Sequence, residues 1–156
     1  MNNKQHQAKY LSLSDSKTVK VEIPDFTTKM NGGPLTIESP TFTIRGKDLS
    51  IQVTPNDRNT KNIGVYLHNH SKDTITAKFT VKSLKNDKPW SVETVVDKSE
   101  FKADQGWGTP KYKSHKEYRW FIKSEDDVFR LEFEVTLYFT AEDLDCPNKR
   151  YPVSSN

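Results

Sequence analysis

Two histidines separated by one residue are the first candidates for chemistry in this chain. The sequence His68-Asn69-His70 ends an apolar run, and alternation along a strand would place both imidazoles on one face. Two histidines are too few to hold zinc without a third ligand. His115 is distant in sequence, and no cysteine or carboxylate has ligand spacing with the pair. We therefore predict two turn or edge histidines, with no metal site and no cofactor.

The other reactive side chains do not form a catalytic pattern. Cys146, the only cysteine, stands beside Pro147 in a polar stretch, where we expect no positioned base. Asp126-Asp127 opens the longest alternating segment, which is typical of a turn and strand entry rather than of a calcium loop. The chain has no phosphate-binding glycine loop, Gly-x-Ser-x-Gly or His-Glu-x-x-His motif. We predict that it is not an enzyme.

A recognition surface is the better interpretation of residues 101–112, which centre on Gly106-Trp107-Gly108. Flanking glycines are unusual for a core tryptophan, because they permit close backbone approach and unusual dihedrals. An indole on such a segment suits a peptide-binding edge, where rings wall a groove and bare backbone pairs with an extended ligand. Large rings are numerous for so polar a chain, and some must fill the core. The set is Tyr66, Phe79, Trp90, Phe101, Trp107, Tyr112, Trp120 and Phe121.

The elements that would position these residues are strands, because apolar and polar residues alternate almost throughout the middle of the chain. Alternation is clearest in residues 19–23, 49–54, 75–81 and 129–139, with shorter candidates at 41–44, 63–67 and 91–96. Turn-forming residues separate them at 31–34, 45–48, 55–57 and 85–87. No segment keeps a helical period for three turns, and at most one helical turn is expected within 114–118. Seven or eight short strands predict an all-β sandwich or barrel.

Length and composition indicate one ordinary domain of mixed charge. The 156 residues are 33% hydrophobic and 29% charged, with a net charge of +3 from 24 basic and 21 acidic residues. That excess is small and spread out, so we expect no nucleic-acid partner. We expect a flexible segment at 1–16, the sandwich at 17–140 and a polar tail or linker at 141–156. One cysteine, no apolar leader and no apolar stretch of membrane length predict a cytoplasmic or nuclear protein without membrane contact.

Six segments, taken in order, resemble the motifs of one family. They are Val21-Glu22-Ile23-Pro24-Asp25-Phe26, Leu49-Ser50-Ile51-Gln52-Val53-Thr54-Pro55-Asn56, Gly64-Val65-Tyr66-Leu67, Ala77-Lys78-Phe79-Thr80-Val81, Gly106-Trp107-Gly108 with Lys111-Tyr112, and 126–137. The corresponding motifs are Trp-x-Ile-x-x-Phe, Trp-x-Leu-x-Val-x-Pro-x, Leu-Ser-Leu-Tyr-Leu, Ala-Lys-Phe, Trp-Gly-Phe-x-Lys-Phe and Asp-Asp-x-Leu-x-x-x-x-Glu-Val. The chain thus resembles a MATH (meprin and TRAF homology) domain. In pattern it is nearest to the substrate-binding domain of speckle-type POZ protein-like adaptors.

The resemblance implies an antiparallel β-sandwich of about eight strands that binds short extended peptides in a shallow groove on one sheet. Adaptors of this family bring substrates to cullin-based ubiquitin ligases, and TRAF proteins bind receptor tails. The family's groove rings correspond here to Tyr66, Phe79 and Trp107, with Gly108 supplying backbone beside the ligand.

Other positions of the implied peptide site depart from the adaptor pattern. The adaptor branch has tyrosine at Ser99, Lys-Asp at Gln105-Gly106 and phenylalanine at Thr109. Val21 and Leu49 stand where the family has tryptophans. The resemblance therefore implies groove binding without the adaptors' preference for serine/threonine-rich motifs. Two alternatives stay open: a targeting module of a deubiquitinase or other hydrolase, and a stand-alone, self-associating structural domain.

Overall fold

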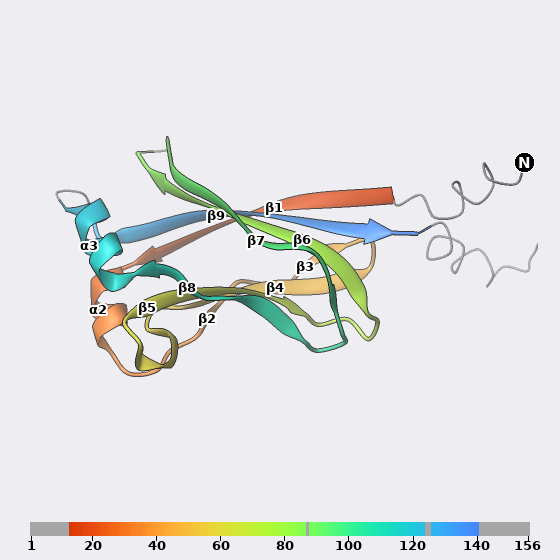
Figure 1. Cartoon of the computed structure of the whole chain (residues 1–156), viewed down its shortest axis with the longest axis horizontal. Coiled ribbons are helices and arrows are strands. Elements are labelled where there is room, and N and C mark those ends of the chain that lie inside the picture. The colour runs from red at the N-terminus through yellow and green to blue at the C-terminus, as the bar shows by residue number, and fades with distance from the viewer. Residues whose placement is uncertain (1–12, 87, 124–125, 141–156) are drawn as a thin grey trace, which may run out of the picture.

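Two antiparallel β-sheets packed face to face form the protein (Figure 1). The computed structural model describes residues 13–86, 88–123 and 126–140. These residues contain nine strands, two short α-helices and one 3-10 turn. The predicted all-β sandwich is confirmed.

One sheet has four strands and contains both long terminal strands. Its order is β1 (Leu13–Pro24), β9 (Val128–Phe139), β6 (Ile75–Lys85) and β7 (Lys88–Phe101), so β1 and β7 are its edges. β1 and β9 pair along their whole length, from Leu13 opposite Phe139 to Pro24 opposite Val128. Within the described residues, strand pairing extends back to Leu13, inside the segment 1–16 that we predicted to be flexible.

The other sheet has five strands and contains the predicted recognition segment. Its order is β2 (Ile37–Glu38), β4 (Lys47–Thr54), β5 (Asn62–Asn69) and β8 (Gly106–Ser114), and β3 (Phe42–Ile44) also pairs with β4. The 3-10 turn η1 (Asp57–Asn59) joins β4 to β5. β8 is an edge strand, and the loop 102–105 connects it to β7, the edge of the opposite sheet. Two free edges therefore lie on the same side of the sandwich.

The core follows from the period-two alternation in sequence. In β9, every second residue from Phe129 to Leu137 is buried, with Phe133 and Val135 fully so. On the other sheet, Leu49, Ile51 and Val53 of β4 face the same interior. One face of each sheet is therefore apolar while the other carries the charged residues, as an antiparallel sandwich requires.

Two helices, α2 (Phe26–Asn31) and α3 (His115–Ile122), close one end of the sandwich (Figure 1). Phe26, Tyr118 and Phe129 pack edge to face around one point, with ring centroids 4.8–5.0 Å apart. Asp127 joins the two helices, because its carboxylate accepts hydrogen bonds from Thr27 N and Oγ1 and from Tyr118 Oη at 2.9–3.1 Å. The single helical turn expected near 114–118 is a two-turn helix, and α2 was not predicted. No helix in the described part of the chain is long and apolar enough to cross a membrane.

Candidate functional site

Most residues of the predicted peptide site lie on β5 and β8. Tyr66 is on β5, and Gly106, Trp107, Gly108 and Thr109 follow one another on β8. Three members lie elsewhere: Gln105 ends the β7–β8 loop, Ser99 lies exposed on β7, opposite Ala77 of β6, and Phe79 is on β6.

Trp107 lies exposed on the free edge of the five-stranded sheet. Its register partner is Leu67, whose side chain is fully buried, so alternation alone would direct the indole inward. Because none of the described strands pairs with the outer side of β8, the indole remains 47% exposed. The ring at this position is therefore accessible to solvent.

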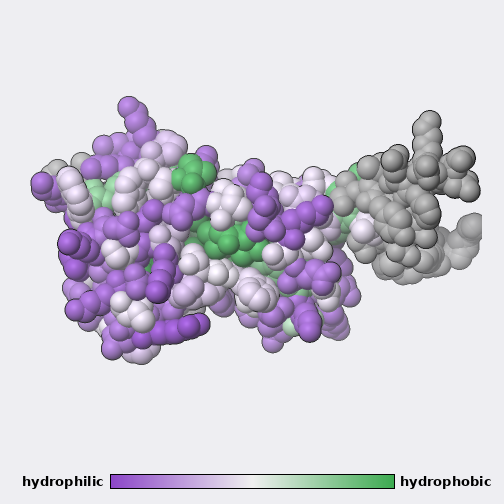
Figure 2. All heavy atoms as spheres, viewed as in Figure 1, coloured by the Kyte–Doolittle hydropathy of each residue, from purple (hydrophilic) through white to green (hydrophobic). Residues whose placement is uncertain are grey.

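Apolar atoms are also visible between the two sheet edges. Figure 2, seen with β7 and β8 toward the viewer, shows an apolar strip in the middle of this face, flanked by hydrophilic side chains. On β7, Val95 is partly buried against the core, whereas Val92, which is 57% exposed, lies opposite Lys82 on the outer face of the four-stranded sheet. The edges thus combine unpaired backbone with apolar side chains.

At its other end, the space between β7 and β8 is bridged by side chains. Lys113 Nζ of β8 lies 2.8 Å from Glu93 Oε2 of β7, and the Tyr112 hydroxyl lies 3.3 Å from Ser91 Oγ. Tyr112 is 4% exposed and also hydrogen-bonds to Ser83. These contacts hold the two sheets together beyond Thr109 and leave the Trp107 end of β8 as the accessible part.

Tyr66 is fixed on the outer face of the sheet by two glycines and a carboxylate. A Cβ on Gly64 or on Gly108 would lie 2.9 Å from its ring, so only glycine leaves room for the ring there. The hydroxyl donates to Asp57 Oδ2 at 2.5 Å, and Thr54 Oγ1 donates to the same oxygen at 2.7 Å. Partial burial, and secondly this hydrogen bond, raises the pKa of Tyr66 well above its ordinary value. Tyr66 is therefore a half-buried, neutral and immobile ring.

The packing of β8 against β5 explains why residue 108 is glycine, which the sequence alone did not show. A Cβ at this position would lie 2.0 Å from the carbonyl oxygen of Val65 and 2.7 Å from Cα of Tyr66. Glycine is thus required for β5 and β8 to close against each other. The same backbone can still face a ligand along the outer edge, since that edge is unpaired.

Phe79 does not belong to an accessible groove, and this part of the predicted site is wrong. It lies on β6 of the four-stranded sheet, is fully buried, and stacks on Phe133 with centroids 5.5 Å apart. The side chain points between the sheets, because alternation places it on the same face as Val81 and Ala77. A ligand on the surface cannot reach it in this structure.

Gln105 is largely engaged within the loop 102–105. Its side-chain oxygen accepts a hydrogen bond from Lys102 N at 2.7 Å, and its backbone oxygen accepts one from Asn69 N at 2.9 Å. Thr109 Oγ1 accepts from Lys111 N at 3.2 Å. Of the predicted residues, Tyr66, Gly106, Trp107, Gly108 and Thr109 lie on the paired strands β5 and β8, but the Tyr66 ring is on the outer face of the sheet and Trp107 is in register with inward-facing Leu67.

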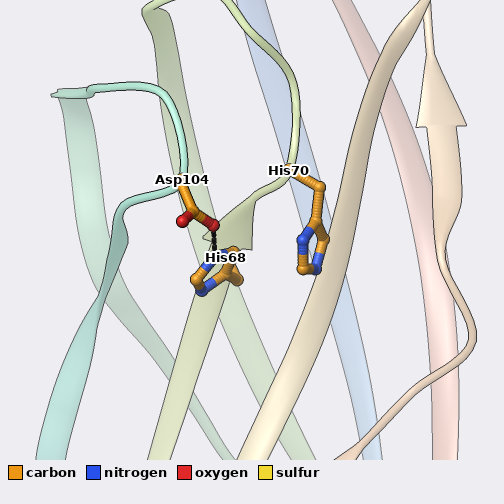
Figure 3. A group of neighbouring side chains, drawn as sticks. All are labelled: His68, His70 and Asp104. Atoms are coloured by element: carbon orange, nitrogen blue, oxygen red, sulfur yellow. Dashed lines mark hydrogen bonds and ion pairs between the residues drawn. The ribbon is translucent and has the colours of Figure 1, made fainter.

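A polar cluster that sequence reasoning missed lies at the end of β5, on the outer face of the sheet (Figure 3). His68 Nε2 donates to Asp104 Oδ1 at 2.9 Å, and the His68 and His70 ring centroids are 4.4 Å apart. His70 Nε2 lies 2.8 Å from Ser50 Oγ and 3.2 Å from Glu38 Oε2. Hydrogen bonds from these partners, led by Ser50 for Glu38 and His68 for Asp104, hold the pKa of both carboxyls below the usual range. The alternation of His68 and His70 was a signal for this face, but nothing in sequence spacing pointed to Asp104.

A cavity of about 700 Å³ opens at the opposite end of the molecule, between the β6–β7 hairpin and α3. Trp90 stacks on Phe121 with centroids 3.8 Å apart, and Trp120 is 70% exposed. The cavity is lined by Lys85, Asn86, Lys88, Pro89, Trp90, Glu117, Trp120 and Phe121.

The family relationship suggested by the sequence motifs is confirmed by comparison with known protein families. The sequence profile of the MATH domain matches residues 18–135, which is most of the chain. The chain belongs to the MATH domain family. MATH domains are generally protein-interaction modules and are typically non-catalytic. No curated protein matches the chain. Since this MATH domain exposes Trp107 on a free strand edge, protein partners are the expected ligands. Cys146 and the tail 141–156 lie outside the described residues.

Proposed function

We propose that this MATH domain binds short extended peptide segments of other proteins along the free edge of β8, with Trp107 as the main side-chain contact. The observation that carries the proposal is the 47% exposure of Trp107 on an edge strand between two glycines. Exposed tryptophans are rare on ordinary surfaces and common at binding hot spots.

The backbone of β8 supports addition of a short strand. Residues 106–109 pair with β5 on one side only, so their outward N–H and C=O groups can pair with a peptide. Pro110 has no N–H, and the pairing register shifts there, with Pro110, Lys111 and Tyr112 opposite Gly64 alone. A bound peptide would therefore pair over about four or five residues.

The expected affinity is modest. Covering the exposed half of an indole removes about 100 Å² of apolar surface, worth about 2 kcal/mol. Backbone pairing adds register and some affinity, while ordering the peptide costs free energy. We expect a dissociation constant on the order of 10–100 micromolar, and avidity would require a second copy or a multivalent partner.

A labelled peptide panel tests the proposal. Fluorescence anisotropy on the full chain should find peptides that bind with that affinity, and Trp107→Ala should weaken binding at least tenfold. Trp120→Ala is the matched control, because it removes an even more exposed tryptophan at the other end of the molecule and should leave binding unchanged. Equal loss in both variants, or binding that survives Trp107→Ala in a folded protein, would refute the β8 site.

We further propose that such binding serves substrate recognition for a ubiquitin-ligase adaptor, or TRAF-like binding of receptor tails. The support is the family resemblance together with the exposed edge. The panel should therefore contain serine/threonine-rich segments and receptor-tail segments in equal number. Sedimentation at two concentrations separates peptide binding from the self-association alternative, in which two copies of the chain pair through β8.

A further inference from the structure

We propose that His68, His70 and Asp104 form a binding site for a divalent transition-metal ion of the Zn²⁺ type. One ligand atom from each of these residues lies within 4.8 Å of the other two. Figure 3 shows the two imidazoles near each other where β5 ends, with the Asp104 carboxylate reaching His68 from the β7–β8 loop.

The backbone prepares this arrangement. His68 and His70 are two residues apart at the end of β5, so both project to the outer face, while Asn69 between them is fully buried. The Asn69 side-chain amide donates to the carbonyls of Phe101 and Lys102 at 3.2 and 3.1 Å. The middle residue of the triplet therefore anchors the loop that presents Asp104 to its two neighbours.

The hydrogen bonds around His70 leave a nitrogen suited to a metal. Ser50 Oγ has one hydrogen and donates it to Glu38 Oε2 at 2.5 Å, so His70 Nε2 must donate to Ser50. A neutral His70 then carries its lone pair on Nδ1. A carboxylate and a hydroxyl that fix the far nitrogen of a histidine are the usual outer partners of a metal ligand.

The donor set selects the class of ion. Two imidazoles and one carboxylate are characteristic of zinc and related first-row metals, whereas calcium and magnesium prefer oxygen ligands alone. Ligand atoms of a tetrahedral zinc ion lie about 3.4 Å apart, so a separation at the 4.8 Å limit must close by about 1.4 Å. The Asp104 side chain is 89% exposed and can make that adjustment. The ion would take the place of the hydrogen on His68 Nε2 that faces Asp104, and that proton would move to Nδ1 of the same ring.

Calorimetric titration of ZnCl₂ into the untagged full chain at pH 7.5 tests this site. A Cys146→Ser, His6→Ala background removes other candidate ligands outside the described residues. We expect one ion per chain, with a dissociation constant on the order of 10 micromolar. His68→Ala and Asp104→Asn should each weaken binding at least tenfold. Asp73→Asn is the matched control, because it removes an exposed carboxylate from the neighbouring loop, where it pairs with Lys47.

A second measurement keeps the test independent of folding. Asp104→Asn changes a highly exposed side chain, so its melting temperature without metal should equal that of the parent. In NMR spectra, zinc should shift the ring signals of His68 and His70 and leave those of buried His115 in place. Binding weaker than about 1 millimolar, or binding that is unaffected by both His68→Ala and Asp104→Asn, would overturn the proposal.

Discussion

Replacing Gly108 by alanine should destabilise the domain strongly, because the new methyl group has no space. Its Cβ would lie 2.0 Å from the Val65 carbonyl oxygen and 2.7 Å from Cα of Tyr66. Both are backbone atoms of a central strand, so relief requires β5 and β8 to separate. Overpacking of this kind costs about 1–3 kcal/mol, and weakening the Tyr66–Asp57 hydrogen bond adds about 1 kcal/mol.

We therefore expect Gly108→Ala to lower the free energy of unfolding by about 2–4 kcal/mol, or the melting temperature by about 5–15 °C for a domain of this size. Gly106→Ala is the matched control two residues away on the same strand. Its Cβ would lie 3.3 Å from the movable imidazole of His68, and reduced entropy of the unfolded chain offsets part of the cost. That variant should stay within about 1 kcal/mol of the parent.

Urea denaturation followed by tryptophan fluorescence measures both variants. A Gly108→Ala protein as stable as Gly106→Ala would show that strand closure does not depend on this glycine. The conformational argument would then be refuted, and a role confined to ligand contact would be the remaining reason for the residue. Peptide binding by each folded variant separates these two roles.

Two further predictions concern stability. Asp127→Ala should lower the free energy of unfolding by about 2–4 kcal/mol, because it removes the acceptor that joins Thr27 to Tyr118. Asp126→Ala should lower it by less than about 1 kcal/mol, since the ion pair of Asp126 with Arg130 is exposed. Equal losses of stability in thermal melts would contradict this prediction. Burial, chiefly, lowers the pKa of His115, whose Nε2 donates to the Pro55 carbonyl at 2.7 Å. The unfolded chain then binds more protons below about pH 6.5, so the free energy of unfolding should fall as the pH drops from 7 to 5. His115→Gln should flatten that slope in urea titrations, and an unchanged slope would exclude His115 as its source.

The sheet framework could be predicted because alternation is a local signal. Residues 129–139 show six apolar positions in a row with period two, and they form the buried face of β9. β8 was recognised as a candidate edge but not as a regular strand, since Gly106, Gly108 and Pro110 all depress strand propensity. Its strand character comes from pairing with β5, which is a tertiary effect.

The helices show the same division between local and distant causes. α3 has a capping box in which Ser114 and Glu117 cap each other, so its start was readable from the Ser-x-x-Glu spacing. α2 has no side-chain cap of its own, because Asp25 adopts a left-handed conformation. The backbone N–H of Thr27 in its first turn donates instead to Asp127, 100 residues further along the chain. No local sequence pattern could predict that contact.

The residues of the candidate sites also differ in whether a local sequence signal could reveal them. Trp107 could be singled out from the sequence because its glycine neighbours are adjacent to it. Phe79 was misplaced because a resemblance of motifs does not state which face of a strand a ring occupies, and here it is the inner face. Asp104 was missed because 36 residues separate it from His68, and only the pairing of β5 with β8 brings them together.

The interruption of β8 at Pro110 has a consequence for solubility. An unbroken open edge invites identical molecules to stack strand upon strand, which is the first step toward fibrils. The proline removes a donor midway along the edge, and the bulge twists the following residues out of line. Such an edge is suited to pairing with one short peptide but not to the repeated addition of strands from identical molecules. Replacing the proline with a strand-forming residue would therefore be expected to shorten the time to visible aggregation in concentrated samples.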